Sequence, residues 1–134
     1  MKDVKSIDTQ LSIVIKEGNV MADVIFTNNL SEKVYLDKWT ICTDDVFRGN
    51  IFSIVDENNK HVMYSGMLVN RKIVPELFIS LNPGESIQTH ITVNKGYELT
   101  KGNKYSVKFC AINPTFREGQ PRIDLMSNKV EITY

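Results

Sequence analysis

Apolar and polar residues alternate with a period of two along most of this chain. Tyr105, Val107 and Phe109 fall on one face of their run, with Ser106 and Lys108 on the other. Such alternation is typical of β-strands that have one buried and one solvated face. Since no segment carries a sustained apolar stripe with the 3.6-residue spacing of a helix, we expect little helix.

Turn signals separate these runs, and two of them are strong: Gly18-Asn19 and Asn82-Pro83-Gly84. About eight or nine short strands at regular spacing predict an all-β fold, an immunoglobulin-like antiparallel β-sandwich of about eight strands. The length of 134 residues predicts a single domain, 1–134. The expected core consists of inward-facing strand residues: Leu11, Ile13, Val24, Phe26, Leu36, Phe52, Ile79, Leu81, Ile91, Val107, Phe109 and Ile132.

Tyr97 precedes the run that begins at Lys104, at a position that suggests a corner between strands. Two interpretations stay open. Its hydroxyl can hydrogen-bond back to the backbone, as in the tyrosine corner of immunoglobulin-like folds, or its ring can simply pack in the core.

The charge balance argues against nucleic acid and against an anionic membrane surface as partners. Lys+Arg and Asp+Glu both number 16, and the basic residues are scattered among acidic ones. Residues 1–8 lack the roughly 7–15 apolar residues of a signal peptide. We therefore expect a cytoplasmic protein, or a secreted one whose signal was removed before this numbering begins.

Few residues suggest chemistry. Cys42 and Cys110 are either two separate thiols or one disulfide, which would be favoured by export. His61 and His90 lack the paired spacing of a zinc site. There is no glycine-rich phosphate loop, and the acidic pairs in turns are better explained as solvated turns than as a calcium site. We expect no catalytic residues, no metal and no cofactor.

Three segments do not follow the strand pattern, and loops beyond about 12 residues in a compact domain are often functional. They are 39–50, 64–76 and 113–126.

Several motifs stand in a characteristic order. They are LDKW at 36–39, GNIFSI at 49–54, YSGMLVNR at 64–71, LNPGES at 81–86, GNKYSV at 102–107 and MSNKV at 126–130. This order, with the loop 64–75 in its midst, resembles the all-β amino-terminal pro-domain of bacterial deuterolysin-type (aspzincin) zinc endopeptidases. The resemblance covers about 11–134, and the regions 40–46 and 110–125 depart from the family pattern.

The resemblance implies a pro-domain that stands without its peptidase domain. Peptidases of the family bind zinc through H-E-x-x-H and a distal aspartate, and this motif is absent from the sequence. In the family the domain is removed on activation and is thought to assist folding or to block the active site. We therefore expect a non-catalytic protein-binding module, a propeptide-like inhibitor or folding partner of a zinc metalloendopeptidase. The alternative is a structural or adhesive immunoglobulin-like domain unrelated to protease control.

The expected contact surface is the loop 64–72, where apolar residues stand beside two cations. The resemblance implies that Arg71 or Lys72 can enter the acidic specificity pocket of lysine-preferring peptidases of the family; the alternative is a pair of solvated loop charges. Trp39 is either a core anchor or a contact residue. The expected partner-binding residues are Tyr64, Met67, Leu68, Arg71, Lys72 and Trp39. Replacing Arg71 and Lys72 together by alanine is expected to weaken partner binding at least about tenfold and to leave stability nearly unchanged.

Overall fold

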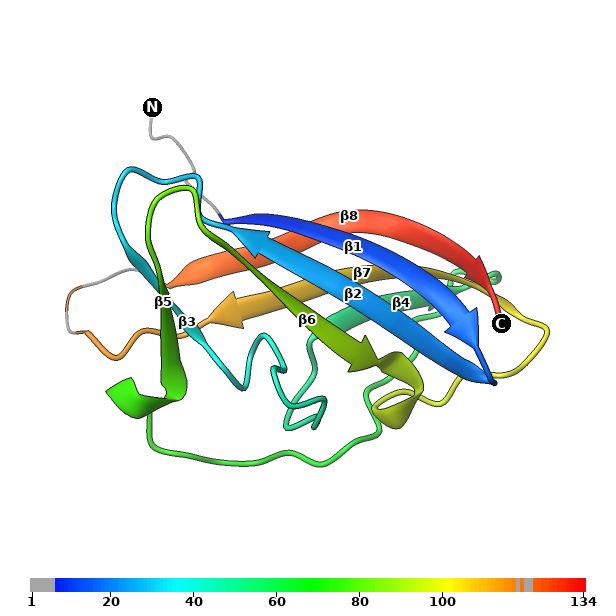
Figure 1. The fold of residues 1–134 in the computed structure, drawn as a ribbon. Helices are drawn as coiled ribbons and strands as arrows, with labels where there is room; N and C mark the ends of the chain where they lie inside the picture. The colour runs from blue at the N-terminus through cyan, green and yellow to red at the C-terminus, as the bar shows by residue number, and fades with distance from the viewer. Residues whose placement is uncertain (1–6, 118, 120–121) are drawn as a thin grey trace.

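The computed structural model describes residues 7–117, 119 and 122–134. Within them the chain is all β, with eight strands in two sheets and only single-turn 3-10 helices (Figure 1). This confirms the expected all-β sandwich with little helix. The elements are β1 (Asp8–Lys16), β2 (Asn19–Thr27), β3 (Val34–Asp37), β4 (Phe52–Asp56), η1 (Pro75–Leu77), β5 (Phe78–Leu81), β6 (Ser86–Thr92), η2 (Val93–Lys95), β7 (Lys104–Asn113) and β8 (Ile123–Thr133). Neither helical turn in this described part has the length and apolar character needed to cross a bilayer.

The large sheet has the strand order β4-β7-β8-β1-β2-β6, and β3 pairs with β5 in the small sheet. Neighbouring strands are antiparallel except β1 and β8, which run parallel and meet at Thr9 and Ser127. Asn128 reinforces this seam, because its side-chain amide accepts from the N–H of Leu11 at 2.8 Å and donates to the carbonyl of Leu11 at 3.0 Å. The side chain thereby replaces ladder hydrogen bonds that a short parallel pairing lacks.

The small sheet crosses the large one at the end where β7 finishes and β8 begins (Figure 1). Asn113, the last residue of β7, joins the two sheets there. Its side-chain oxygen accepts from the N–H of Asp37 at 2.8 Å, and its side-chain nitrogen donates to the carbonyl of Tyr35 at 3.0 Å. This link holds the end of β3 against the large sheet.

Three phenylalanines form the centre of the core. Phe109 packs edge-to-face on Phe26 and on Phe52, with ring centroids 5.3 and 5.5 Å apart, and all three rings are buried. The predicted core residues are buried with three exceptions, Ile13, Ile79 and Ile132, which are half-buried and pack against its edge. The prediction was wrong for these three because alternation indicates the face of a strand but not how completely the opposing layer covers it. Along β1, for example, the exposed fraction rises from 5% at Leu11 to 41% at Ile15.

The segment 39–50 also contributes to the core, which its loop-like sequence does not indicate. Ile41 and Cys42 are completely buried, and Phe47 is nearly so. The phenol oxygen of Tyr97 reaches the end of this segment, accepting from the N–H of Ile51 at 3.1 Å and that of Phe52 at 2.9 Å. Tyr97 therefore both packs its ring and bonds to the backbone, but to residues more than forty positions upstream.

The tyrosine corner is formed by a different residue. Tyr105 stands at the start of β7, and its hydroxyl accepts from the N–H of Thr100, five residues upstream, at 2.8 Å. This is the local geometry that defines the corner in immunoglobulin-like folds. Of the two interpretations left open for Tyr97, the ring packing holds, whereas its hydroxyl bonds across the sandwich to the start of β4 and not locally as in a corner.

Replacing Phe109 by alanine should lower the free energy of unfolding by about 3–5 kcal/mol, because the ring is fully buried between two other rings. Urea denaturation followed by fluorescence measures the change. The matched control is Val14→Ala on the 59%-exposed outer face of β1, which should change stability by about 0.5 kcal/mol or less. Similar losses in both variants would contradict this description of the core.

Candidate functional site

The loop that carries most of the expected contact residues spans the gap between β4 and η1. It runs as an extended segment along the side of the molecule on which the small sheet and the segment 38–51 lie (Figure 1). From residue 63 to residue 74, few of its backbone groups form hydrogen bonds. The N–H of Ser65 donates to Gly96 at 2.9 Å, and the N–H of Val69 donates to Arg48 at 3.1 Å. Its side chains must therefore supply most of what fixes its course.

The strongest of these side-chain contacts is an ion pair. Asp37 ends β3 and is completely buried, and its carboxylate receives both guanidinium nitrogens of Arg71, one of them at 2.6 Å. The N–H groups of Trp39 and Thr40 also donate to this carboxylate, at 3.4 and 3.2 Å. A buried charge is costly unless it is paired and hydrogen-bonded. Arg71 therefore ties the loop to the end of β3.

Two guanidinium groups lie over the ring of Trp39. The Cζ atoms of Arg71 and Arg48 stand 4.5 and 4.6 Å from its ring centroid, a geometry favourable for cation–π attraction. Arg48 in turn forms a bidentate pair with Asp44, at 2.7 and 3.1 Å. This hydrogen-bonded pairing lowers the pKa of Asp44 and raises that of Arg48. Trp39 is half-buried and lies outside the core cluster, so its interpretation as a core anchor was wrong.

Tyr64 organises the start of the loop. Its ring packs on Phe47 and Tyr97, with centroid distances of 6.1 and 5.5 Å, and its hydroxyl donates to the carbonyl of Met67. The chain folds closely over this ring at Gly66, where an added Cβ would come within 2.8 Å of ring carbons. Only a residue without a side chain fits there without displacing Tyr64.

The six expected contact residues thus fall into two groups. Met67 and Leu68 are 57% and 79% exposed, and Lys72 is exposed as well. The second group is Tyr64, Trp39 and Arg71, which form contacts within the protein and hold the loop in place. The expectation that Arg71 is available to a partner must be corrected, because its side chain is 16% exposed and its guanidinium is already bound to Asp37.

Sequence reasoning missed Asp37 and Arg48. The only local signal for Asp37 was its place just after a strand and before Trp39 and Thr40, where an aspartate can accept N–H groups two or three residues on. Nothing local pointed to Arg48 as the second partner of the tryptophan ring.

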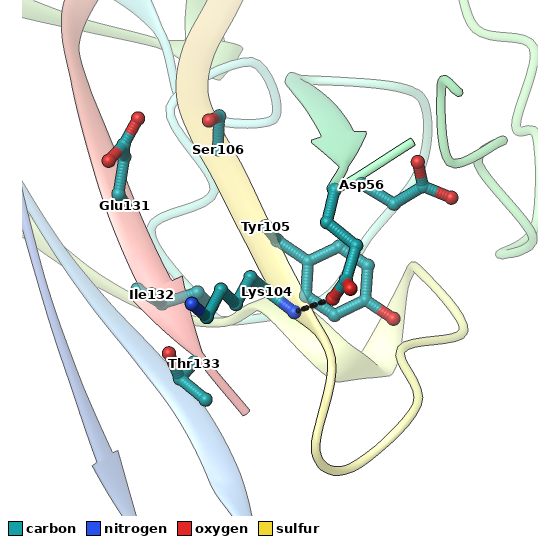
Figure 2. A pocket seen from close by; sticks show the side chains of 8 residues that line it. Asp56, Lys104, Tyr105, Ser106, Glu131, Ile132 and Thr133 are labelled. Atoms are coloured by element: carbon teal, nitrogen blue, oxygen red, sulfur yellow. Dashed lines mark hydrogen bonds between the residues drawn. The ribbon is translucent and has the colours of Figure 1, made fainter. Parts of the chain in front are cut away.

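A shallow groove of about 170 Å³ lies beside Trp39 and the two arginines over its ring. Trp39, Asn50, Val69, Arg71 and Ile112 are among its lining residues. A larger, open hollow of about 400 Å³ lies between the end of β4, the start of β7 and the end of β8 (Figure 2). Its carboxylates include Glu57, which accepts from the backbone N–H of Lys104 at 2.9 Å.

The cysteines and histidines are dispersed. Cys42 is a buried thiol and Cys110 an exposed one, and they are not bonded to each other, which confirms the interpretation as separate thiols. Burial raises the pKa of Cys42 to about 12, with nearby Asp45 adding to the effect, so its thiol is a poor nucleophile near neutral pH. His90 contacts a carboxylate of β2, and His61 bridges to β4. In the part of the chain that the structure describes, no three metal-ligating side chains converge.

Replacing Arg71 by alanine should cost about 3–5 kcal/mol of unfolding free energy, because it leaves the Asp37 carboxylate buried without its partner. The expectation that the Arg71 and Lys72 double variant leaves stability nearly unchanged is corrected accordingly. The matched control is Lys72→Ala, one position along and exposed, which should stay within about 0.5 kcal/mol of the parent. Chemical denaturation of both variants measures this, and equal stability of the two would exclude the ion pair as an anchor.

Comparison with known proteins finds sequence similarity to fungal proteins that are named as proteases. No family model matches it. The neutral protease 2 homolog MEP2 of Coccidioides posadasii is 27% identical over 106 residues, which cover 75% of this chain and 27% of the relative. The probable neutral protease 2 homolog B of Trichophyton rubrum is 28% identical over 120 residues, 87% of this chain and 32% of the relative. A probable neutral protease 2 homolog of Arthroderma benhamiae is 28% identical over 120 residues, 87% of this chain and 31% of the relative.

The chain spans less than a third of the length of these relatives. The relatives are fungal, so the bacterial source implied by the sequence resemblance is not supported. The chain is similar to a minor part of neutral protease 2 homologs.

Proposed function

We propose that this chain is a non-catalytic module that binds a zinc metalloendopeptidase, as a propeptide-like inhibitor or as a folding partner. One observation carries the proposal: most of the chain matches a segment that makes up less than a third of proteins named as proteases. A pro-domain would make up a minor fraction of a protease in the same way. The resemblance of the sequence motifs to deuterolysin-type pro-domains supports the same interpretation.

The sequence supports a role without catalysis. H-E-x-x-H, the zinc-binding motif of deuterolysin-type peptidases, does not occur in it. Its two histidines stand on separate parts of the sandwich, His90 on β6 beside a β2 carboxylate and His61 next to β4. Among the residues that the structure describes, neither is accompanied by the ligand set that peptide hydrolysis on zinc requires.

The loop 64–72 supports a role in protein binding. It presents Met67, Leu68 and Lys72 to solvent while Arg71 and Tyr64 hold it from the inside. A loop fixed in advance loses little conformational entropy on binding, so more of its contact energy appears as affinity. Because Arg71 is engaged internally, Lys72 is the cation of this loop that can reach an acidic group of the partner.

The purified chain should hold no stoichiometric zinc and should cleave no peptide substrate. Elemental analysis and a fluorogenic peptide assay measure these two properties. One zinc per chain, lost on replacing His61 or His90, would overturn the non-catalytic role.

The binding role is tested by supplying the chain to a peptidase that lacks the corresponding segment. We define the trimmed relative as the Trichophyton rubrum homolog B from which the stretch matched by this chain has been removed. Added chain should either inhibit casein hydrolysis by the trimmed relative in a saturable way or raise its yield on refolding. Lys72→Ala should weaken the effect by about tenfold or more, as expected for loss of a paired cation.

The matched control is Lys101→Ala, an exposed lysine in the turn before β7, which should behave like the parent. If the parent chain changes neither activity nor refolding yield, protease control is excluded, and a structural or adhesive immunoglobulin-like domain becomes the better description.

A further inference from the structure

Leu68 is the most exposed of the large apolar side chains that stand out from the described surface. Its exposed fraction is 79%, against 57% for Met67 and 37% for Val69 on either side. An exposed leucine alone is ordinary in soluble proteins. The argument for a site comes from the backbone around it.

Each of the two peptide groups that flank Leu68 forms one hydrogen bond with the rest of the protein. The hydroxyl of Tyr64 donates to the carbonyl of Met67, in the peptide before Leu68. The N–H of Val69, in the peptide after it, donates to the carbonyl of Arg48 at 3.1 Å. Within 7–117, 119 and 122–134, the N–H and C=O of Leu68 itself have no hydrogen-bond partner.

Peptide geometry then decides where the groups of Leu68 point. All peptide bonds of the described chain are trans, and the C=O and N–H of a planar trans peptide point in opposite directions. With the Met67 carbonyl and the Val69 N–H turned toward the protein, the N–H and C=O of Leu68 turn away from it. A strand residue offers its N–H and C=O to a neighbouring strand in this way.

This backbone is also held on both sides of Leu68. Tyr64 packs on Phe47 and Tyr97 before it, and Arg71 binds Asp37 and stacks on Trp39 after it. The leucine is thus presented on a segment whose course is set before any partner arrives. Such pre-organisation favours binding because little ordering entropy remains to be lost.

We infer that Leu68 is the anchor through which this chain occupies the substrate cleft of its peptidase. The side chain enters an apolar pocket, and the Leu68 N–H and C=O pair with the strand at the cleft edge, as an extended peptide adds to a sheet. The peptidase as partner rests on the proposed function. Lys72 lies four residues further, an even spacing that puts it on the same side of an extended chain, about 13 Å away. It therefore reaches a second, acidic group rather than competing for the same pocket.

The test compares two equally exposed apolar residues. Leu68→Asp should weaken binding to the trimmed relative at least tenfold, because a carboxylate cannot enter an apolar pocket without losing its hydration. The matched control is Met63→Asp, at a residue that is 78% exposed but precedes Tyr64 and the bracketed segment. It should bind within twofold of the parent. Dissociation constants from titration calorimetry or surface binding measure both.

A second variant tests the backbone without touching the leucine. Tyr64→Phe keeps the ring on Phe47 and Tyr97 but removes the donor to Met67. It should speed hydrogen exchange at the Val69 amide and weaken binding on the order of threefold or more, with little change in thermal stability.

The outcomes separate the inference from the function it rests on. If the parent binds and Leu68→Asp binds equally well, the anchor is elsewhere and the inference is overturned while the proposed function stands. Equal weakening by Met63→Asp also overturns it, because any apolar surface would then serve. A parent chain that neither binds nor affects the trimmed relative removes the proposed function and the inference together.

Discussion

The buried carboxylate of Asp37 is the interaction on which the arrangement of this molecule's candidate site depends. Asp37 is the last residue of β3, and its carboxylate accepts hydrogen bonds from the N–H groups of the following turn. The backbone N–H of Asp37 donates to Asn113 at the end of β7. The charge of the carboxylate is balanced by Arg71 from a loop 34 residues further along. Asp37 thus joins both sheets through its backbone N–H, and its desolvated carboxylate joins the turn after β3 to the loop 64–72. Removal of either ionic partner leaves the other without compensation.

The consequence for function lies in the side chains that the anchored loop leaves exposed to solvent. Arg71 and Tyr64 form internal contacts that fix the backbone of the loop. The loop therefore exposes Met67, Leu68 and Lys72 on a backbone that does not need to be ordered by a partner. Keeping apolar side chains in solvent gives the folded chain no stability. Their presentation on a fixed segment is consistent with a surface selected for binding, and the stack beneath them determines its shape.

Period-two alternation and turn residues were sufficient to predict the strands and most of the core. Val24, Phe26, Val107 and Phe109 could be assigned to the interior because a strand turns alternate residues to one face. The same rule failed at Ile13, Ile79 and Ile132, since alternation tells which face a residue occupies but not how far the opposing layer extends. The parallel contact of β1 with β8 was equally out of reach, because strand order is not a local property.

The sequence by itself determined that this chain forms an all-β sandwich and that the loop 64–72 concentrates apolar residues and cations. Tertiary structure decided which of those residues are accessible. Arg71 and Lys72 are neighbours of like charge, yet Arg71 is bound to a carboxylate 34 positions away and Lys72 faces solvent. The tyrosine corner likewise belongs to Tyr105 and not to Tyr97, because the hydroxyl of Tyr105 finds a partner five residues away and that of Tyr97 finds partners more than forty residues away. The physical reason is that local pattern specifies burial and direction, whereas pairing between distant polar groups exists only once the layers have packed.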